Sequence, residues 1–166
     1  MNKPKVFLTR ELPPEAMERL KQLTDLELNL EDRVLTKAEL MDGVKGKDAL
    51  LCLLTDQIDK VVLTANPNLK IVANYAVGFN NIDVETATAL GIPVSNTPGV
   101  LTETSADLAF ALLMAVSRRL VEADRFARTG QWKGWGPLQF LGVDVHGGTL
   151  GIIGLGRIGK ALAKRA

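Results

Sequence analysis

The chain has very few of the side chains that build metal centres or covalent catalytic sites. Its 166 residues include one cysteine and one histidine. A lone cysteine excludes a disulfide within the chain. One cysteine and one histidine together cannot supply the ligands of the usual zinc sites. Cys52 lies in the apolar segment Ala49-Leu50-Leu51-Cys52-Leu53-Leu54. We therefore expect a buried, unreactive thiol and no metal site.

An excess of charge of one sign and long apolar runs are also absent. Twenty lysines and arginines stand against nineteen acidic residues, which gives a net charge of +1. Such a balance attracts neither nucleic acid nor an anionic membrane, so we expect neither as a partner. The longest apolar run, residues 108–116, is too short to cross a bilayer. The apolar run within residues 1–9 is too short for a signal peptide. A soluble cytoplasmic protein is the expectation.

Strand-like and helix-like segments alternate through the first hundred residues. Hydrophobic residues make up 46% of the chain, enough for a sizeable core. The alternation predicts an α/β fold with a doubly wound parallel sheet. Leucines alternating with polar residues suggest an edge strand at 26–30, whereas the unbroken apolar run at 49–54 suggests a central one. The predicted strands are 5–9, 26–30, 49–54, 70–73 and 92–95, and the predicted helices follow Pro13-Pro14 or span 36–44, 58–65 and 83–90.

This rhythm ends at Asn96-Thr97-Pro98-Gly99. A long helix is predicted from Thr102, whose hydroxyl could cap it, to about residue 128. We place a domain boundary there, with one domain over residues 1–99 and another beginning at 100 and continuing to 166. The glycine-rich segment 129–148 is predicted to be an irregular connection anchored by Trp132 and Trp135.

A glycine fingerprint, Gly154-Leu155-Gly156-Arg157-Ile158-Gly159, stands near the end of the chain. The apolar segment 149–153 before it predicts a strand, and the residues after it have helical spacing. In such a strand, turn and helix, Gly154 permits the turn, Gly156 lets the pyrophosphate of a dinucleotide approach and Gly159 lets helix and strand pack closely. The alternative is a simple glycine turn between two core elements.

A second candidate site is the loop Asn74-Tyr75-Ala76-Val77-Gly78-Phe79-Asn80-Asn81. It follows a strand, and ligands of open parallel sheets bind at the carboxyl ends of strands. Successive backbone N–H groups around Gly78 could form a concavity for a small carboxylate. Alternatively, Gly78 merely allows a turn while Asn81 or Asp83 caps the next helix. His146 is expected in an exposed loop, and Asp107 is expected to have a structural role.

Four segments together resemble the D-isomer-specific 2-hydroxyacid dehydrogenases, with the greatest similarity to the glyoxylate and hydroxypyruvate reductase branch. They are residues 74–83, 94–103, 106–113 and 148–159. The resemblance implies a flavodoxin-like substrate domain followed by the start of a Rossmann domain that binds NAD or NADP. It implies that Val77 and Gly78 hold the carboxylate of a small 2-oxo acid. Thr102, Gly154, Gly156, Arg157, Ile158 and Gly159 would then bind the coenzyme.

The resemblance also implies that the chain is the N-terminal part of a longer, homodimeric enzyme. The arginine, glutamate and histidine with which such enzymes handle the keto group would lie beyond Ala166, so no catalytic residue is expected in this chain and the fragment alone should be inactive. The acidic residue that recognises the coenzyme ribose is also expected beyond Ala166, which leaves NAD and NADP open. Phosphoglycerate or formate dehydrogenases, and a nucleotide-sensing corepressor of the same fold, are the alternatives.

Overall fold

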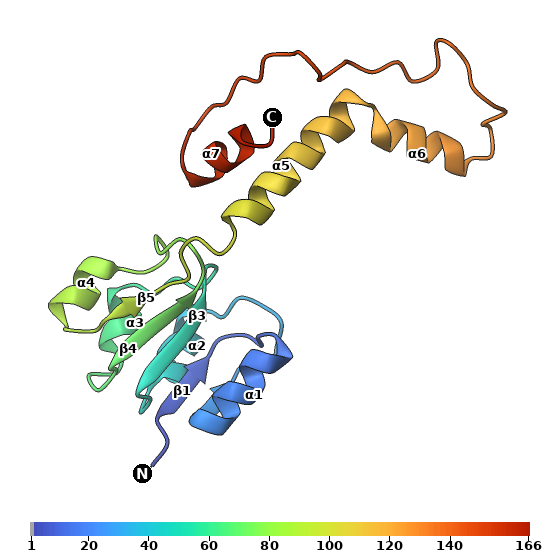
Figure 1. Ribbon diagram of the computed structural model, residues 1–166. Coiled ribbons are helices and arrows are strands. Elements are labelled where there is room, and N and C mark those ends of the chain that lie inside the picture. The colour runs from blue at the N-terminus through green and yellow to red at the C-terminus, as the bar shows by residue number, and fades with distance from the viewer. Residues whose placement is uncertain (1) are drawn as a thin grey trace. The chain divides into compact units, whose positions relative to one another are not determined.

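The computed structural model describes residues 2–166 and divides into two compact units, one ending at Pro98 and one running from Gly99 to Ala166. The first unit holds a five-stranded parallel sheet with the order β2-β1-β3-β4-β5 (Figure 1). Its strands are β1 (Lys5–Leu8), β2 (Asp25–Leu28), β3 (Ala49–Leu53), β4 (Ile71–Tyr75) and β5 (Val94–Ser95). Its helices are α1 (Pro14–Leu23), α2 (Lys37–Val44), α3 (Lys60–Thr64) and α4 (Val84–Ala89).

The strand order explains why helices cover both faces of this sheet. The connection from β1 to β2 runs in one direction along the sheet, and the later connections run in the other. Because crossovers between parallel strands are right-handed, α1 lies on one face and α2, α3 and α4 lie on the opposite face. The predicted doubly wound α/β fold is confirmed, and its order is the flavodoxin-like one. The direction reverses between β1 and β3, which is where such sheets open a crevice for ligands.

The main core lies on the face that α2, α3 and α4 cover. Paired residues of parallel strands share a face, and Phe7, Leu50 and Val72 are paired across β1, β3 and β4 and buried together. β2 is an edge strand and β3 the central one, as their patterns predict. Cys52 is fully buried on the core face, and this burial, assisted by the charge of Asp56, raises the pKa of its thiol to about 12.

Three helices of the first unit begin at a side chain that accepts hydrogen bonds from the first turn. Thr36 and Glu39 form a reciprocal capping box at α2, and Asp59 caps α3. Asp83 caps α4, as one alternative predicts, and the side-chain and backbone hydrogen bonds from Thr86 hold the pKa of its carboxyl below the ordinary value. The cap at Asp83 fixes where the loop after β4 ends.

The second unit contains α5 (Thr102–Ser117), α6 (Leu120–Arg128) and α7 (Arg157–Ala163). α5 and α7 pack together, and Arg165 joins them by ion pairs with Glu103 and Asp107, which gives Asp107 the structural role predicted for it. His146 is exposed, as expected. Within residues 2–166, no helix is long and apolar enough to cross a membrane.

The predicted single helix from 102 to 128 is wrong. It breaks at Arg119, whose φ of 53° lies in the left-handed region, and α6 begins after it. The predicted hydroxyl cap is also wrong, because Leu101 occupies the cap position and Thr102 is already the first helical residue.

The predicted strand at 149–153 does not form, and the described part of the second unit contains no strand. A strand needs a neighbour to bond its backbone groups, and residues 99–166 supply none. Ile153 is consequently fully exposed. Trp132 and Trp135 are 60% and 85% exposed, so neither is the hydrophobic anchor predicted.

Gly43 is predicted to be essential for packing α2 against the sheet. A Cβ at this position would meet ring atoms of Phe7 at 2.2–2.6 Å. We expect Gly43→Ala to lower the free energy of unfolding by about 1–3 kcal/mol, although alanine favours a helix over glycine by about 1 kcal/mol. In a Phe7→Leu background the same change should be neutral or stabilising, since the ring is gone. Urea unfolding of the four proteins tests this, and equal losses in both backgrounds would contradict it.

Candidate functional site

Val77 and Gly78 lie in the loop that leaves β4 at the carboxyl edge of the sheet. Four successive carbonyl groups of this loop accept hydrogen bonds from the protein. The Thr97 amide donates to the carbonyl of Ala76 at 2.9 Å, and the Ile82 amide donates to that of Phe79 at 3.0 Å. Side-chain amides hold the two carbonyls between them: Asn96 Nδ2 donates to Val77 O at 2.8 Å, and Asn74 Nδ2 donates to Gly78 O at 2.9 Å.

Most backbone amides of the same loop, in contrast to its carbonyls, have no hydrogen-bond partner among the described residues. The N–H of Ala76 donates to the carbonyl of Asn74. Among residues 2–166, no acceptor bonds the N–H groups of Val77, Gly78 or Phe79. The loop therefore satisfies its acceptors within the protein and leaves a run of consecutive donors free, with Val77, Gly78 and Phe79 at its start, which is the arrangement of a backbone site for an anion.

Gly78 is not needed for the turn itself. Its φ lies outside the left-handed region, so another residue could adopt the same backbone. A Cβ there would meet only Oδ1 of Asn80, at 3.2 Å. The φ of Gly78 therefore does not require glycine, although the close approach of Asn80 favours a residue without a Cβ.

A buried polar cluster beneath this loop was not predicted from the sequence. It consists of Asn74, Asn81, Asp56 and Thr9, all 6% exposed or less. Asn74 donates to Oδ1 of Asn81 at 3.0 Å, and Thr9 donates its hydroxyl proton to Asp56 at 2.6 Å. The signal that could have revealed it is Asn74 itself: β4 continues to Tyr75, past the predicted end at Ala73, so an asparagine lies within a central strand, where it is uncommon.

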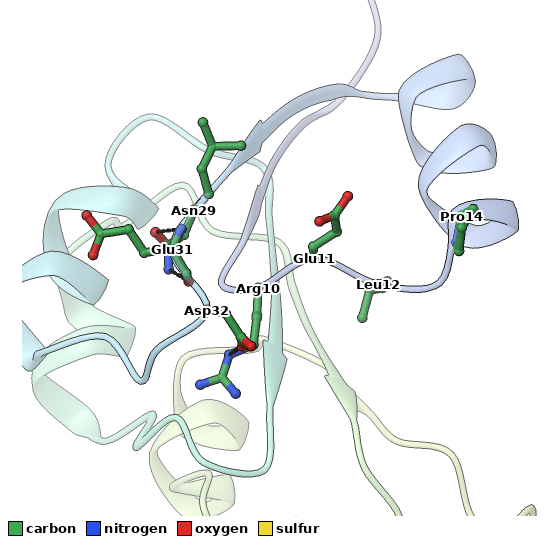
Figure 2. Close-up of a pocket in the computed structure, with 8 residues that line it drawn as sticks. Arg10, Glu11, Leu12, Pro14, Asn29, Glu31 and Asp32 are labelled. Atoms are coloured by element: carbon green, nitrogen blue, oxygen red, sulfur yellow. Dashed lines mark hydrogen bonds and ion pairs between the residues drawn. The ribbon is translucent and has the colours of Figure 1, made fainter.

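A cavity of about 460 Å³ opens elsewhere on the same edge, after β1 and β2 (Figure 2). Arg10 lies there 3.5 Å from Asp32, and Glu11 and Glu31 also line the cavity. Three carboxylates against one guanidinium make it a poor site for an anionic ligand. The loop after β4 is therefore the better candidate, and a smaller cavity of about 160 Å³ is lined by its residue Phe79 together with Asn96.

The glycine fingerprint lies in the second unit, immediately before α7. Gly154 has a φ of 90°, a conformation that favours glycine. A Cβ on Gly159 would meet the carbonyl oxygen of Gly154 at 2.2 Å, so this position also requires glycine. Gly156 has an ordinary φ, and no protein atom lies within 4 Å of a Cβ built there. Backbone conformation thus explains Gly154 and packing within the described residues explains Gly159, whereas Gly156 faces open space.

The remaining predicted coenzyme residues lie in the same unit. Arg157 and Ile158 open α7, and among the described residues neither backbone N–H has an acceptor. Thr102 opens α5 and donates its backbone N–H to Gly99 at 3.3 Å. The structure thus assigns Val77 and Gly78 to one unit and all the predicted coenzyme residues to the other. The catalytic arginine, glutamate and histidine, expected beyond Ala166, fall outside the described residues, so their placement stays a prediction.

The difference between Gly159 and Gly156 predicts different responses to alanine. Gly159→Ala should push α7 away from the turn and increase amide hydrogen exchange in residues 157–163 by about tenfold, equivalent to about 1.4 kcal/mol of local stability. Gly156→Ala should change the exchange of α7 much less, because its Cβ meets nothing and only the weaker capping by alanine acts on the helix. Exchange followed by NMR distinguishes them, and a similar response from both variants would contradict the assigned roles.

Known proteins similar to this chain belong to one family. Residues 6–149 match the family model described as D-isomer specific 2-hydroxyacid dehydrogenase, catalytic domain. A glyoxylate reductase from Thermococcus litoralis is 54% identical over 168 residues, which cover 99% of this chain and 51% of that protein. A glyoxylate reductase from Korarchaeum cryptofilum is 55% identical over 165 residues, with coverages of 99% and 50%. The chain spans about half the length of the curated relatives it matches.

Solved structures of proteins with similar sequences have the same fold as this chain. A crystal structure of a Thermus thermophilus protein superposes with a TM-score of 0.88 at 47% identity, covering 97% of this chain and 52% of that one. The NADPH-dependent glyoxylate/hydroxypyruvate reductase of Sinorhizobium meliloti, crystallised with NADP and malonate, superposes with a TM-score of 0.74 at 34% identity, with coverages of 99% and 50%. The family predicted from the loop and fingerprint motifs is confirmed: this chain belongs to the D-isomer-specific 2-hydroxyacid dehydrogenases.

Proposed function

We propose that the complete protein is an oxidoreductase that uses NAD or NADP to reduce a small 2-oxo acid, with glyoxylate or hydroxypyruvate as the substrate. The observation that carries this proposal is the loop after β4, in which four consecutive carbonyls are satisfied while the consecutive amides of Val77, Gly78 and Phe79 are free. The names of the relatives support glyoxylate over the substrates of phosphoglycerate or formate dehydrogenases, and they support an enzyme over a corepressor.

The role of the first unit in this reaction is to bind and orient the substrate. The amides of Val77 and Gly78 donate to the carboxylate of the 2-oxo acid, and each such bond is strong because the acceptor is charged. Fixing the carboxylate also fixes the keto carbon next to it, which is the benefit of orientation in catalysis. Residues 1–99 are accordingly the substrate-binding domain of the proposed enzyme.

The second unit, residues 100–166, is proposed to begin the coenzyme-binding domain. The open space at Gly156 and the free amides of Arg157 and Ile158 fit a pyrophosphate, while Gly154 and Gly159 hold the turn that presents them. Thr102 is proposed to lie beside the coenzyme. When bound, the nicotinamide supplies the hydride.

The groups that stabilise the developing alkoxide and deliver its proton are proposed to lie beyond Ala166. The complete enzyme is further proposed to be a cytoplasmic homodimer. Under this proposal the 166-residue chain contributes binding and orientation but no general acid, so alone it should not oxidise NADH or NADPH in the presence of glyoxylate.

Gly156→Val is predicted to weaken coenzyme binding in the complete protein. A branched side chain would fill the space proposed for the pyrophosphate, without meeting protein atoms within 4 Å of its Cβ. We expect the dissociation constant of the preferred coenzyme to rise by about tenfold or more, equivalent to about 1.4 kcal/mol. Fluorescence titration with NADH and NADPH measures it. Wild-type affinity would show that the fingerprint does not hold the coenzyme.

Gly78→Val is predicted to impair the use of the 2-oxo acid instead. The φ of Gly78 is not left-handed and a Cβ there would meet only the side chain of Asn80, at 3.2 Å, so the fold should persist while the side chain obstructs the free amides. The expected loss is about 1.5–3 kcal/mol for each hydrogen bond to the carboxylate, seen as a lower kcat/KM for glyoxylate with coenzyme affinity nearly unchanged. Steady-state kinetics of the complete protein decides, and unaltered kinetics would remove this loop from the site.

A further inference from the structure

Each free amide of the loop after β4 is oriented by the carbonyl of the preceding residue, which points in the opposite direction. No described peptide bond is cis. In a trans peptide the carbonyl of one residue and the N–H of the next point in opposite directions. Each carbonyl that the protein holds inward therefore turns the following amide outward. The Thr97 amide, by holding Ala76 O, turns out the N–H of Val77.

For each of the next two amides, the preceding carbonyl is held by an asparagine side chain. Asn96 Nδ2 holds Val77 O at 2.8 Å, which turns out the N–H of Gly78. Asn74 Nδ2 holds Gly78 O at 2.9 Å, which turns out the N–H of Phe79. We propose that Asn96 and Asn74 are positioning residues for the carboxylate site, and that the Phe79 amide is its third donor. This proposal rests on the proposed function of the Val77 and Gly78 amides.

The direction of the Asn74 bond is fixed by its surroundings. Asn74 is 3% exposed, and both hydrogens of its side-chain amide are used, one on Gly78 O and the other on Asn81 Oδ1 at 3.0 Å. Its Oδ1 faces Cys52, whose Sγ donates weakly at 3.6 Å. A carbonyl oxygen could not donate to Gly78 O, so flipping the amide would break both strong bonds.

Asn81 anchors this arrangement to the loop after β3. Its Nδ2 donates to the carbonyls of Leu53 and Asp56 at 3.1 and 3.0 Å. The carboxylate of Asp56 in turn accepts from the Leu53 amide and from the hydroxyl of Thr9 at the end of β1. The ends of β1, β3 and β4 are thus joined beneath the loop, at the point where the winding of the sheet reverses. Asn74 holds the loop from a rigid base.

Asn96→Ala in the complete protein is the test. Asn96 is only partly buried, so its loss should spare the fold while freeing Val77 O and the peptide that carries the Gly78 N–H. We expect KM for glyoxylate and the inhibition constant of oxamate, a carboxylate probe, to rise by about tenfold. The coenzyme dissociation constant should not change. A merely structural role would lower the active fraction or the melting temperature and leave the oxamate constant unaltered.

Asn29→Ala is the matched control. Asn29, in the loop after β2, also donates its side-chain amide to loop carbonyls, that of Thr9 after β1 and that of Glu31 in its own loop. Its loss should leave the oxamate constant at the wild-type value. The inference is overturned if Asn96→Ala binds oxamate as tightly as the wild type, or if Asn29→Ala loses as much affinity. Failure of the wild-type enzyme to bind oxamate or reduce any 2-oxo acid would instead overturn the proposed function.

NMR of the wild-type protein tests the third donor without a substitution. Titration with oxamate should shift the ¹⁵N–¹H signals of Val77, Gly78 and Phe79 together and with one dissociation constant. The signal of Ala76, whose N–H is already bonded within the protein, serves as the internal reference. A Phe79 signal that stays still while Gly78 moves would remove the third donor.

Discussion

The opposition of carbonyl and amide across a flat peptide bond is the constraint on which the candidate site depends. A protein cannot aim a backbone N–H directly, but it can bind the preceding carbonyl. Here donors from three separate segments bind four consecutive carbonyls of one loop: Asn74 from β4, Ile82 from before α4, and Asn96 and Thr97 from after β5. A site with no charged side chain in it is thereby made suitable for an anion.

The reversal of winding in the sheet determines where this can happen. The connection after β1 runs toward one edge of the sheet and the connection after β3 runs toward the other. At the point where these connections part, the hydroxyl of Thr9 donates to the carboxylate of Asp56. The buried polar cluster in this place has no unsatisfied side-chain nitrogen or oxygen among the described residues. Had all connections run in one direction, helices would have covered only one face of the sheet and no such reversal would exist.

Apolar patterns predicted most of the fold because they report burial directly. The alternating leucines of β2 and the continuous run of β3 correctly distinguished edge from centre. The errors lie where a structure depends on partners distant in sequence. Residues 149–153 have the composition of a strand without a neighbour to pair with, and Arg119 takes a left-handed conformation that no glycine announces. The motif predicts Val77 and Gly78 as site residues but gives no sign of Asn96, because Asn96 lies 19 residues from its acceptor Val77 and meets it only in the folded chain.

The bonding of all four carbonyls of the loop after β4 has a consequence for the size of ligand that the proposed site could bind. A two-carbon 2-oxo acid has so few atoms that even at the best known efficiency it gains only about 7 kcal/mol on binding. Ordering four flexible residues would cost about 4–8 kcal/mol, which would consume nearly all of that gain. Because residues 76–79 are ordered by folding, the ligand does not meet this cost. Under the proposed function, this rigidity would make so small a molecule a feasible substrate, and a larger acid would need it less.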